Sequence, residues 1–224
     1  SDINKMVPKD ELHKHGSVYH ITLLAQNNEG LKNLFKIVSL LNTKYFYKTP
    51  RILRSEIEKH RKGLLIGSSC ASGEVFSLAR SKTDDEMNSV IQFYDYIEIQ
   101  PLSVYSPLVQ MGDFANMTEL TEHVKKIIRI ARDNNKMLVA TGDVHHLDKK
   151  DKIYREIIIN QKVPGGGRHP LSRNNIKEIP SQHFFTTDEM LAEFSFLGED
   201  LAKEMVITNP NKIADEIETI EIIK

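Results

Sequence analysis

The stretch MLVATGDVHHLDKKD, residues Met137–Asp151, runs from an apolar segment into a polar turn. Its first residues are apolar without alternation, which is typical of a strand buried on both faces of a parallel sheet. Binding sites in such sheets lie at the carboxyl ends of the strands, where Asp143 and His145 stand in this stretch. One residue separates them, so both side chains can face the same side. The stretch therefore predicts either a metal site or the polar end of an ordinary strand.

Three earlier apolar runs of strand length are separated by helical patterns. After the first run, the apolar residues of segment 31–41 recur at helical spacing. The alternation of buried strands with helices predicts an α/β fold with parallel strands and helices packed outside them. The predicted strands are residues 18–25, 63–69, 95–100 and 137–143.

Several helix boundaries are also predicted by the sequence. The helix that follows the second strand is interrupted near Ser81–Thr83, and Thr118 is a candidate N-cap for the next long helix. Beyond Lys150 the pattern predicts a further helix, a Gly-rich loop and several short helices. Thr187 is a candidate cap for the first of these short helices, and another begins near Asn209.

The composition excludes several classes of protein. In 224 residues, Lys plus Arg number 30 and Asp plus Glu number 31, so no overall basic field favours nucleic acid or an anionic membrane. The single cysteine, Cys70, excludes an intrachain disulfide framework and suits a reducing compartment. No apolar run approaches the ~20 residues of a membrane span, and the polar start has no signal-peptide core. The sequence predicts a soluble, cytoplasmic chain.

Four side chains at the ends or edges of the apolar runs are candidate metal ligands. Their residue types, histidine, cysteine and aspartate, all bind zinc and other divalent metals. The four are His20, Cys70, Asp143 and His145. Each also has an ordinary interpretation, because cysteine is common in protein cores and a histidine at a strand end is often only hydrogen-bonded. Cys70 as a thiol nucleophile at a strand-to-helix turn is a further alternative, but it leaves the other three unexplained.

Other histidines and the Gly-rich loop give weaker signals. His13 and His15 form a His-x-His pair in a charged segment, which favours a solvated linker. His60, His123 and His169 stand without evident partners in the sequence, and the loop PGGGR lacks the lysine and hydroxyl of a phosphate-binding P-loop. None of these features predicts a site.

Long strings of the sequence resemble one known family. In chain order they are YHITLLAQNNEGLKNLFKIVS, LLIGSSCASGEVF, LVATGDVHHLDKKD and HFFTTDEMLAEFSFLGEDLAKEMVITNPNKIAD. They are similar to the polymerase and histidinol phosphatase (PHP) domain of bacterial replicative DNA polymerase III, in particular the PolC type. The resemblance implies a distorted (β/α)7 barrel that holds divalent metals at its strand ends. It also places His20, Cys70, Asp143 and His145 among the metal ligands and leaves His146, at a position that is often tyrosine, outside them.

The opening ligand motifs of the family have no counterpart in this sequence. In PolC-type enzymes an exonuclease domain is inserted in the PHP domain, so the chain resembles the portion that follows this insertion, a partial barrel with a helical tail leading to the palm. The implied division is a linker at 1–17, PHP domain at 18–160, a Gly-rich loop at 161–182 and a helical PHP–palm junction at 183–224. Zn²⁺, Mn²⁺ or Mg²⁺ would be bound in a complete PHP domain and only weakly or not at all here.

Three functional hypotheses follow. The first is a mainly structural, metal-binding part of a polymerase whose parent performs DNA synthesis and 3′–5′ proofreading, with no catalytic residue in this segment. The second is a metal-dependent phosphoesterase or exonuclease, and the third is an interaction module without metal chemistry. The implied partners are the exonuclease and palm of the same chain, with DNA and the sliding clamp reached through the parent, and no membrane. An open sheet edge would also favour self-association.

Overall fold

The computed structural model describes residues 12–220, except 163, 164, 166, 168, 174, 175 and 177. Predicted linker residues 1–11 and part of the Gly-rich loop therefore lie outside the described residues. The first half contains η1 (Leu12–Lys14), β1 (Thr22–Ala25), α2 (Asn28–Asn42), α3 (Arg54–Lys59), β2 (Leu64–Gly67), α4 (Glu74–Leu78), α5 (Asp84–Ile91), β3 (Tyr96–Ile99), α6 (Leu102–Tyr105) and α7 (Pro107–Gln110). The second half contains α8 (Met117–Asp133), β4 (Met137–Ala140), η2 (Lys149–Asp151), α9 (Lys152–Asn160), α10 (Pro170–Arg173), α11 (Thr187–Glu193), η3 (Ser195–Leu197), α12 (Glu199–Lys203), the π-helical η4 (Glu204–Thr208) and α13 (Asn209–Asp215).

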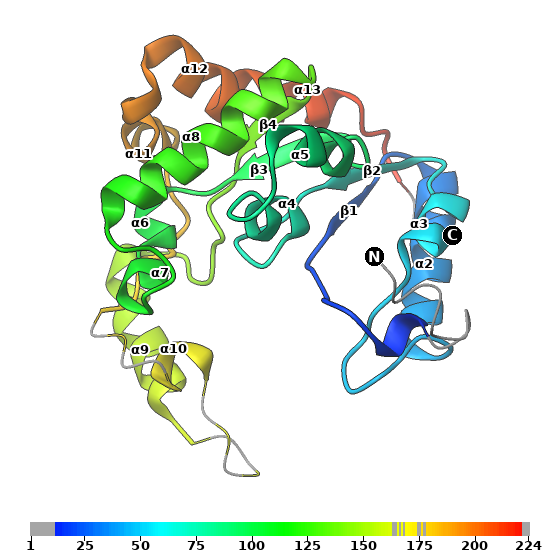
Figure 1. The fold of residues 1–224 in the computed structure, drawn as a ribbon, viewed down its shortest axis with the longest axis horizontal. Helices are drawn as coiled ribbons and strands as arrows, with labels where there is room; N and C mark the ends of the chain where they lie inside the picture. Colours follow the sequence, from blue (N-terminus) through cyan, green and yellow to red (C-terminus); the bar gives the residue numbers. More distant parts are fainter. Residues whose placement is uncertain are drawn as a thin grey trace.

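The four strands form one sheet in the order β1-β2-β3-β4 (Figure 1). Each lies inside a segment predicted to be a strand, so the α/β class and the strand positions are confirmed. β2 and β3, and β3 and β4, are parallel as predicted. β1 pairs antiparallel with β2, so the prediction of four parallel strands is wrong for the first strand.

The direction of β1 follows from how α2 packs. The chain leaves β1 at Gln26, whose N–H donates to the carbonyl of Gly63 at the entry to β2 over 2.9 Å. Gly30 in the first turn of α2 lies directly against Gly63. After α2 and α3 the chain therefore returns to the end of the sheet that β1 has just left. β2 must start there and run back along β1, which makes the pair antiparallel.

Both faces of the sheet are covered, as the apolar strands require. On one face, Ile66, Ile97 and Leu138 join the main core with side chains of α4, α5 and α8. On the other face, Tyr96 and Val139 pack with Ile213 of α13 in a smaller cluster. Because Ile213 belongs to this cluster, the helical tail is part of the fold rather than a detached segment.

α9 and α10 lie at the opposite end of the molecule from β1 and α2 (Figure 1).

The tail also contacts the edge strand β4. Asn209, which is 3% exposed, donates from Nδ2 to the carbonyl of Leu138 in the edge strand β4 over 2.8 Å. This hydrogen bond ties the tail to β4, and the prediction of an exposed sheet edge stays a prediction. Beyond α13 the chain reaches the other side of the sheet, where the N–H of Glu218 donates to the carbonyl of Gln26 over 2.8 Å.

Two predicted helix caps are shifted. α8 is capped by Asn116 rather than Thr118, and α11 is capped by Thr186 rather than Thr187. In both cases the side chain that reaches the free N–H groups stands just before the helix, as capping geometry requires. The predicted interruption before α5 is confirmed, since Thr83 forms a capping box with Glu86.

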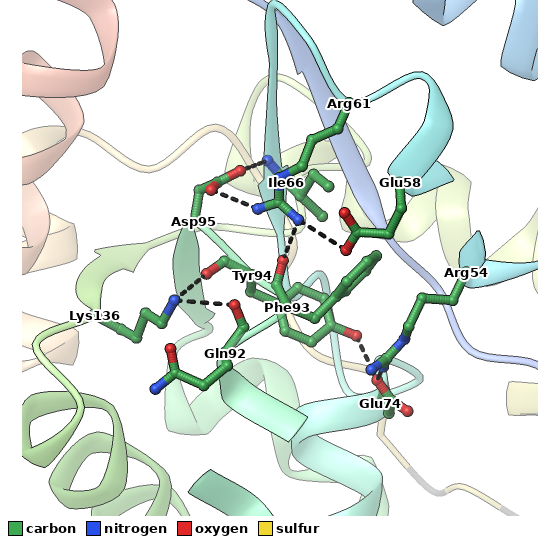
Figure 2. Close-up of polar contacts among 10 residues, drawn as sticks. All are labelled: Arg54, Glu58, Arg61, Ile66, Glu74, Gln92, Phe93, Tyr94, Asp95 and Lys136. Atoms are coloured by element: carbon green, nitrogen blue, oxygen red, sulfur yellow. Dashed lines mark hydrogen bonds and ion pairs between the residues drawn. The ribbon is translucent and has the colours of Figure 1, made fainter. Parts of the chain in front are cut away.

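A polar network joins the amino ends of the parallel strands (Figure 2). Asp95, just before β3, accepts from the N–H of Ile66 over 2.7 Å and from Arg61 over 2.6 Å. Arg61 also donates to the carbonyl of Phe93 over 2.8 Å. Lys136, just before β4, donates to the carbonyl of Tyr94 over 2.8 Å. This network lies at the end of the strands opposite to the candidate site and fixes how they start.

His123 in α8 has a partner, contrary to the sequence prediction. It is 8% exposed and donates from Nε2 to the carbonyl of Phe76 over 3.0 Å, while its ring lies against Phe76 and Phe114. Burial lowers the pKa of His123 to about 4, and the cations of Arg80 and Lys126 act in the same direction. His123 is therefore a neutral core residue.

This depressed pKa predicts a pH-dependent stability. The unfolded chain takes up a proton at His123 below about pH 6.5, whereas the folded chain does so only near pH 4. The contribution of neutral His123 to the stability of the fold is fully present above pH 6.5 and is lost as the pH falls toward 4. When the pH falls from about 7.5 to about 5, the free energy of unfolding should decrease in both chains. We expect the decrease to be about 1–2 kcal/mol smaller in His123→Gln than in the parent chain. Urea denaturation at both pH values measures this, with exposed His15→Gln as control; equal losses would contradict it.

No helix among the described residues combines the length and the apolar character needed to cross a lipid bilayer.

Candidate metal site at the strand ends

The strand ends near the candidate ligands have unusual backbone. Ser69, just after β2, has φ +62°, and Asp143, just after β4, has φ +48°. Both values lie in the left-handed region, which is uncommon for residues other than glycine and is concentrated at functional sites. The two left-handed residues therefore mark the same edge of the sheet at which the sequence places Cys70 and Asp143.

His20 and Cys70 are brought together by the structure. Nδ1 of His20 lies 3.3 Å from Sγ of Cys70. Two such donors on one tetrahedral zinc ion would lie about 3.6 Å apart, from metal–ligand distances of about 2.3 and 2.05 Å. The spacing of this pair fits two ligands of a shared metal ion. Backbone contacts hold this pair together. The N–H of His20 donates to the carbonyl of Ser72 over 3.0 Å, and His20 forms an isolated parallel β-bridge with Gly73.

Asp143 and His145 form a second pair. Nδ1 of His145 donates to the carbonyl of Asp143 over 2.7 Å, which leaves Nε2 available as a metal ligand. Gln182 is 4% exposed, and its side-chain amide donates to the carboxylate of Asp143 over 2.5 Å. Its backbone carbonyl accepts from the N–H of His145 over 2.7 Å. The segment before α11 therefore holds this strand end in place, a role that the sequence analysis missed.

One member of each pair acts electrostatically on a buried phenol. Tyr105 of α6 is 2% exposed, and its oxygen accepts from the N–H of Gln100 over 3.0 Å. Burial raises the pKa of Tyr105, and the nearby acidic groups of Cys70, Glu98 and Asp143 raise it further. Groups at the ends of β2, β3 and β4 therefore act electrostatically on Tyr105. Within the described residues, however, no three histidine, cysteine, aspartate or glutamate side chains are grouped closely enough to hold a metal ion.

A cation stands beside Asp143. Burial lowers the pKa of Arg155 in α9, and the Asp143 carboxylate opposes this effect. Nε of Arg155 is buried and has no hydrogen-bond partner within the described residues. Burial lowers the pKa of His169 in the Gly-rich loop, and the charges of Arg155 and His145 act in the same direction. His169 was predicted to be without partners, but its Nδ1 accepts from the N–H of Leu171 over 3.2 Å.

A cavity of about 690 Å³ lies beside His20. It is also lined by His13, Arg51, Glu74 and Tyr94. His13 is 9% exposed and meets the ring of Tyr45 edge-on, so the prediction of a solvated linker is wrong at this residue.

The chain is similar to known proteins along its whole length. Residues 5–102 match the family described as PHP domain. Over 223 residues, all of this chain, it is 46% identical to DNA polymerase III PolC-type of Bacillus subtilis (strain 168) and covers 15% of that protein. This chain is a relative of PolC-type DNA polymerase III and contains PHP-domain sequence.

Two further PolC-type polymerases support the same relationship. The protein of Halalkalibacterium halodurans is 48% identical over 204 residues, 91% of this chain and 14% of that protein. The protein of Pediococcus pentosaceus is 44% identical over 216 residues, 96% of this chain and 15% of that protein. The resemblance read from the sequence is confirmed. The chain spans about 15% of the length of the curated relatives it matches.

Proposed function

We propose that the chain is the PHP portion of a PolC-type replicative DNA polymerase, whose parent enzyme performs DNA-templated synthesis with 3′–5′ proofreading. The observation that carries the proposal is the 46% identity to such a polymerase along the whole chain. In this reading residues 1–17 are a linker from the exonuclease, 18–160 are PHP domain, 161–182 are a loop and 183–224 join the palm. The setting is the cytoplasm, with DNA and the sliding clamp reached through the parent.

The role of this segment is mainly structural, with no catalytic residue among its side chains. His20, Cys70, Asp143 and His145 are the proposed metal ligands. The His20–Cys70 pair supports this, and so does the hydrogen bond to the Asp143 carbonyl that orients the ring of His145. A bound Zn²⁺, Mn²⁺ or Mg²⁺ would supply positive charge between them. His20 and His145 lie more than a hundred residues apart in sequence, so a shared ion would link distant segments and stabilise the fold. We expect binding here to be weak, because the described residues contain no group of three candidate ligands close enough to hold a metal ion.

Substitutions in the full-length polymerase test this site. Asp143→Asn keeps the size and tolerates the left-handed backbone, but replaces a charge with a dipole, so we expect metal affinity to fall about tenfold. His145→Ala removes the ligand, and we expect a larger loss. Metal analysis and thermal unfolding of the PHP region should show metal content and melting temperature falling together.

The matched control is Asp133→Asn, because Asp133 is an exposed aspartate in α8. It should change neither metal content nor melting temperature. If the variants at Asp143 and His145 keep the metal content and melting temperature of the parent, these residues are not ligands and GDVHH is only the polar end of a strand.

An apolar surface on α9 supports contact with other parts of the polymerase. Ile153, Tyr154, Ile157 and Ile158 are each more than half exposed on this helix. Clustered exposed apolar side chains are typical of surfaces that contact other proteins. The exonuclease and palm of the same polypeptide are the proposed occupants, and self-association through β1 or this surface is a second candidate for the isolated chain. An interaction module without metal chemistry would use the same surface.

A metal-dependent phosphoesterase or exonuclease is the second candidate function. The buried Nε of Arg155 favours it, because it has no hydrogen-bond partner within the described residues and the side chain interacts electrostatically with Asp143. A guanidinium next to a metal site can bind a phosphate oxygen. Phosphatase and nuclease assays with added manganese separate this candidate from a structural role. Turnover that is lost in Arg155→Gln would support the enzyme.

A further inference from the structure

We propose that Glu98 is the positioning residue of the His20–Cys70 pair: its carboxylate holds the turn after β2 in the form that presents the thiol to the imidazole. The inference deepens the proposed metal-binding function and rests on it for the identity of the ligand. A carboxylate in the middle of the apolar strand β3 is otherwise unexplained.

The carboxylate of Glu98 reaches across from β3 to the end of β2. Its Oε1 accepts from the N–H of Ser69 over 3.1 Å. The N–H of Glu98 itself donates to Oγ of Ser68, which is 3% exposed, over 2.9 Å. The strand register between β2 and β3 contains only the pair Gly67–Tyr96. Glu98 therefore extends the contact between these strands beyond their short backbone ladder.

The sequence leaves room for this carboxylate at Gly67. A Cβ atom at Gly67 would lie 2.5 Å from Oε1 of Glu98 and 2.4 Å from Cζ of Tyr96. Both distances are shorter than any real carbon contact, so a side chain at this position would displace Glu98. The ring of Tyr96 and the carboxylate of Glu98 together occupy the space that a side chain at the glycine of LLIGSSC would need.

The hydrogen bond from Ser69 fixes the backbone that leads to Cys70. Ser69 has φ +62°, a conformation that a serine does not favour and that needs support from its surroundings. An ionised acceptor for its N–H provides this support, because hydrogen bonds to charged groups are stronger than neutral ones. Without the acceptor, Ser69 is free to relax, and Cys70 moves with it.

Hydrogen bonds in the rest of the turn fix the position of Cys70 relative to His20. The N–H of Gly73 donates to the carbonyl of Cys70 over 2.7 Å, which closes the turn. His20 is bonded to the same turn through Ser72 and Gly73. One acceptor at Ser69 and one closed turn therefore determine the 3.3 Å separation of Nδ1 and Sγ.

Three substitutions at Glu98 test the role in the metal-free chain. Glu98→Gln keeps an acceptor at the same distance, Glu98→Asp withdraws it by one methylene, and Glu98→Ala removes it. The readout is the nuclear Overhauser contact between the His20 ring and the Cys70 Hβ protons. We expect the contact to persist in Glu98→Gln and to fall several-fold in the other two, with exposed Glu122→Ala as control. Persistence in Glu98→Ala, or equal losses in Glu98→Gln and Glu98→Asp, would overturn the proposal.

A rescue variant separates positioning from general destabilisation. Because glycine adopts positive φ without penalty, Ser69→Gly should restore the contact in the Glu98→Ala background, at least in part. No restoration in a folded double variant would count against the proposal. Where Glu98→Ala does not fold, the comparison of Glu98→Gln with Glu98→Asp decides.

Cobalt binding tests the metal side separately. Cys70 is the only cysteine of the chain, so a thiolate-to-cobalt absorption band reports this residue alone. We expect Glu98→Ala to weaken Co²⁺ binding about tenfold, as loss of an outer support typically does, and Glu98→Gln to bind within twofold of the parent chain. If the parent chain shows no such band, the proposed metal site fails, while the Overhauser contact still decides the role of Glu98.

Discussion

Gly30→Ala is expected to destabilise the fold by at least about 3 kcal/mol, through overpacking at a contact between two backbones. The sign is informative, because alanine in an open helical position stabilises a helix by up to about 1 kcal/mol relative to glycine. The expected effect is therefore opposite to the helix propensity.

The reason is the contact between α2 and the entry to β2. A Cβ atom at Gly30 would lie 1.8 Å from the carbonyl oxygen of Gly63 and 2.6 Å from its carbonyl carbon. Gly63 cannot move away easily, since it has φ +74° and its carbonyl accepts from the N–H of Gln26. α2 would have to lift from the sheet, which would disturb the β1–β2 pairing as well.

Urea denaturation of Gly30→Ala and of Ser39→Ala, an exposed substitution in the same helix, measures the effect. Ser39→Ala should remain within about 0.5 kcal/mol of the parent chain. Stabilisation by Gly30→Ala would show that α2 and Gly63 are not in contact and that the direction of β1 has another cause.

This contact also shows where sequence reasoning ends. The positions of the strands were predictable because continuous apolar runs need burial on both faces, whatever their neighbours are. The direction of β1 was not predictable, since it depends on Gly30 and Gly63 meeting across more than thirty residues. Neither glycine carries a pattern that identifies its partner.

The candidate site also has one part that was predictable from the sequence and one part that was not. The nearness of Asp143 and His145 follows from their spacing on one chain segment, and this much was visible in the sequence. Gln182 has no such signal, because it reaches Asp143 from a loop about forty residues further on. Glu98 did have a signal, a carboxylate inside an apolar strand, which requires a partner when it is half-buried. Unexplained charges within predicted strands therefore merit the same attention as those at strand ends.

Asp95→Ala is expected to cost about 3 kcal/mol, because it removes two acceptors at the amino ends of β2 and β3. Ile66 is fully buried, and its N–H donates to Oδ2 of Asp95 over 2.7 Å. Without the carboxylate this N–H is left without that acceptor, which costs about 1–3 kcal/mol. Arg61, whose side chain is 28% exposed, loses its 2.6 Å ion pair at the same time (Figure 2).

The comparison with Asp95→Asn separates the two contributions. The amide oxygen of asparagine can still accept from the N–H of Ile66, but the amide cannot pair with the charge of Arg61. We expect Asp95→Asn to cost about half as much as Asp95→Ala, measured by urea denaturation. Asp133→Ala, which removes an ion pair at a side chain that is 65% exposed, should cost less than about 0.5 kcal/mol.

If Asp95→Ala also remained within about 0.5 kcal/mol of the parent chain, the network would behave like an ordinary surface ion pair. The strand starts would then be held by the core alone. The expected result instead divides the sheet by function, because its amino ends stabilise the fold through Asp95 while its carboxyl ends carry strained backbone and the candidate metal ligands. Substitutions at the first end should lower stability without changing metal binding. Conservative substitutions at the second end should weaken metal binding and lower only the part of the stability that the bound metal contributes.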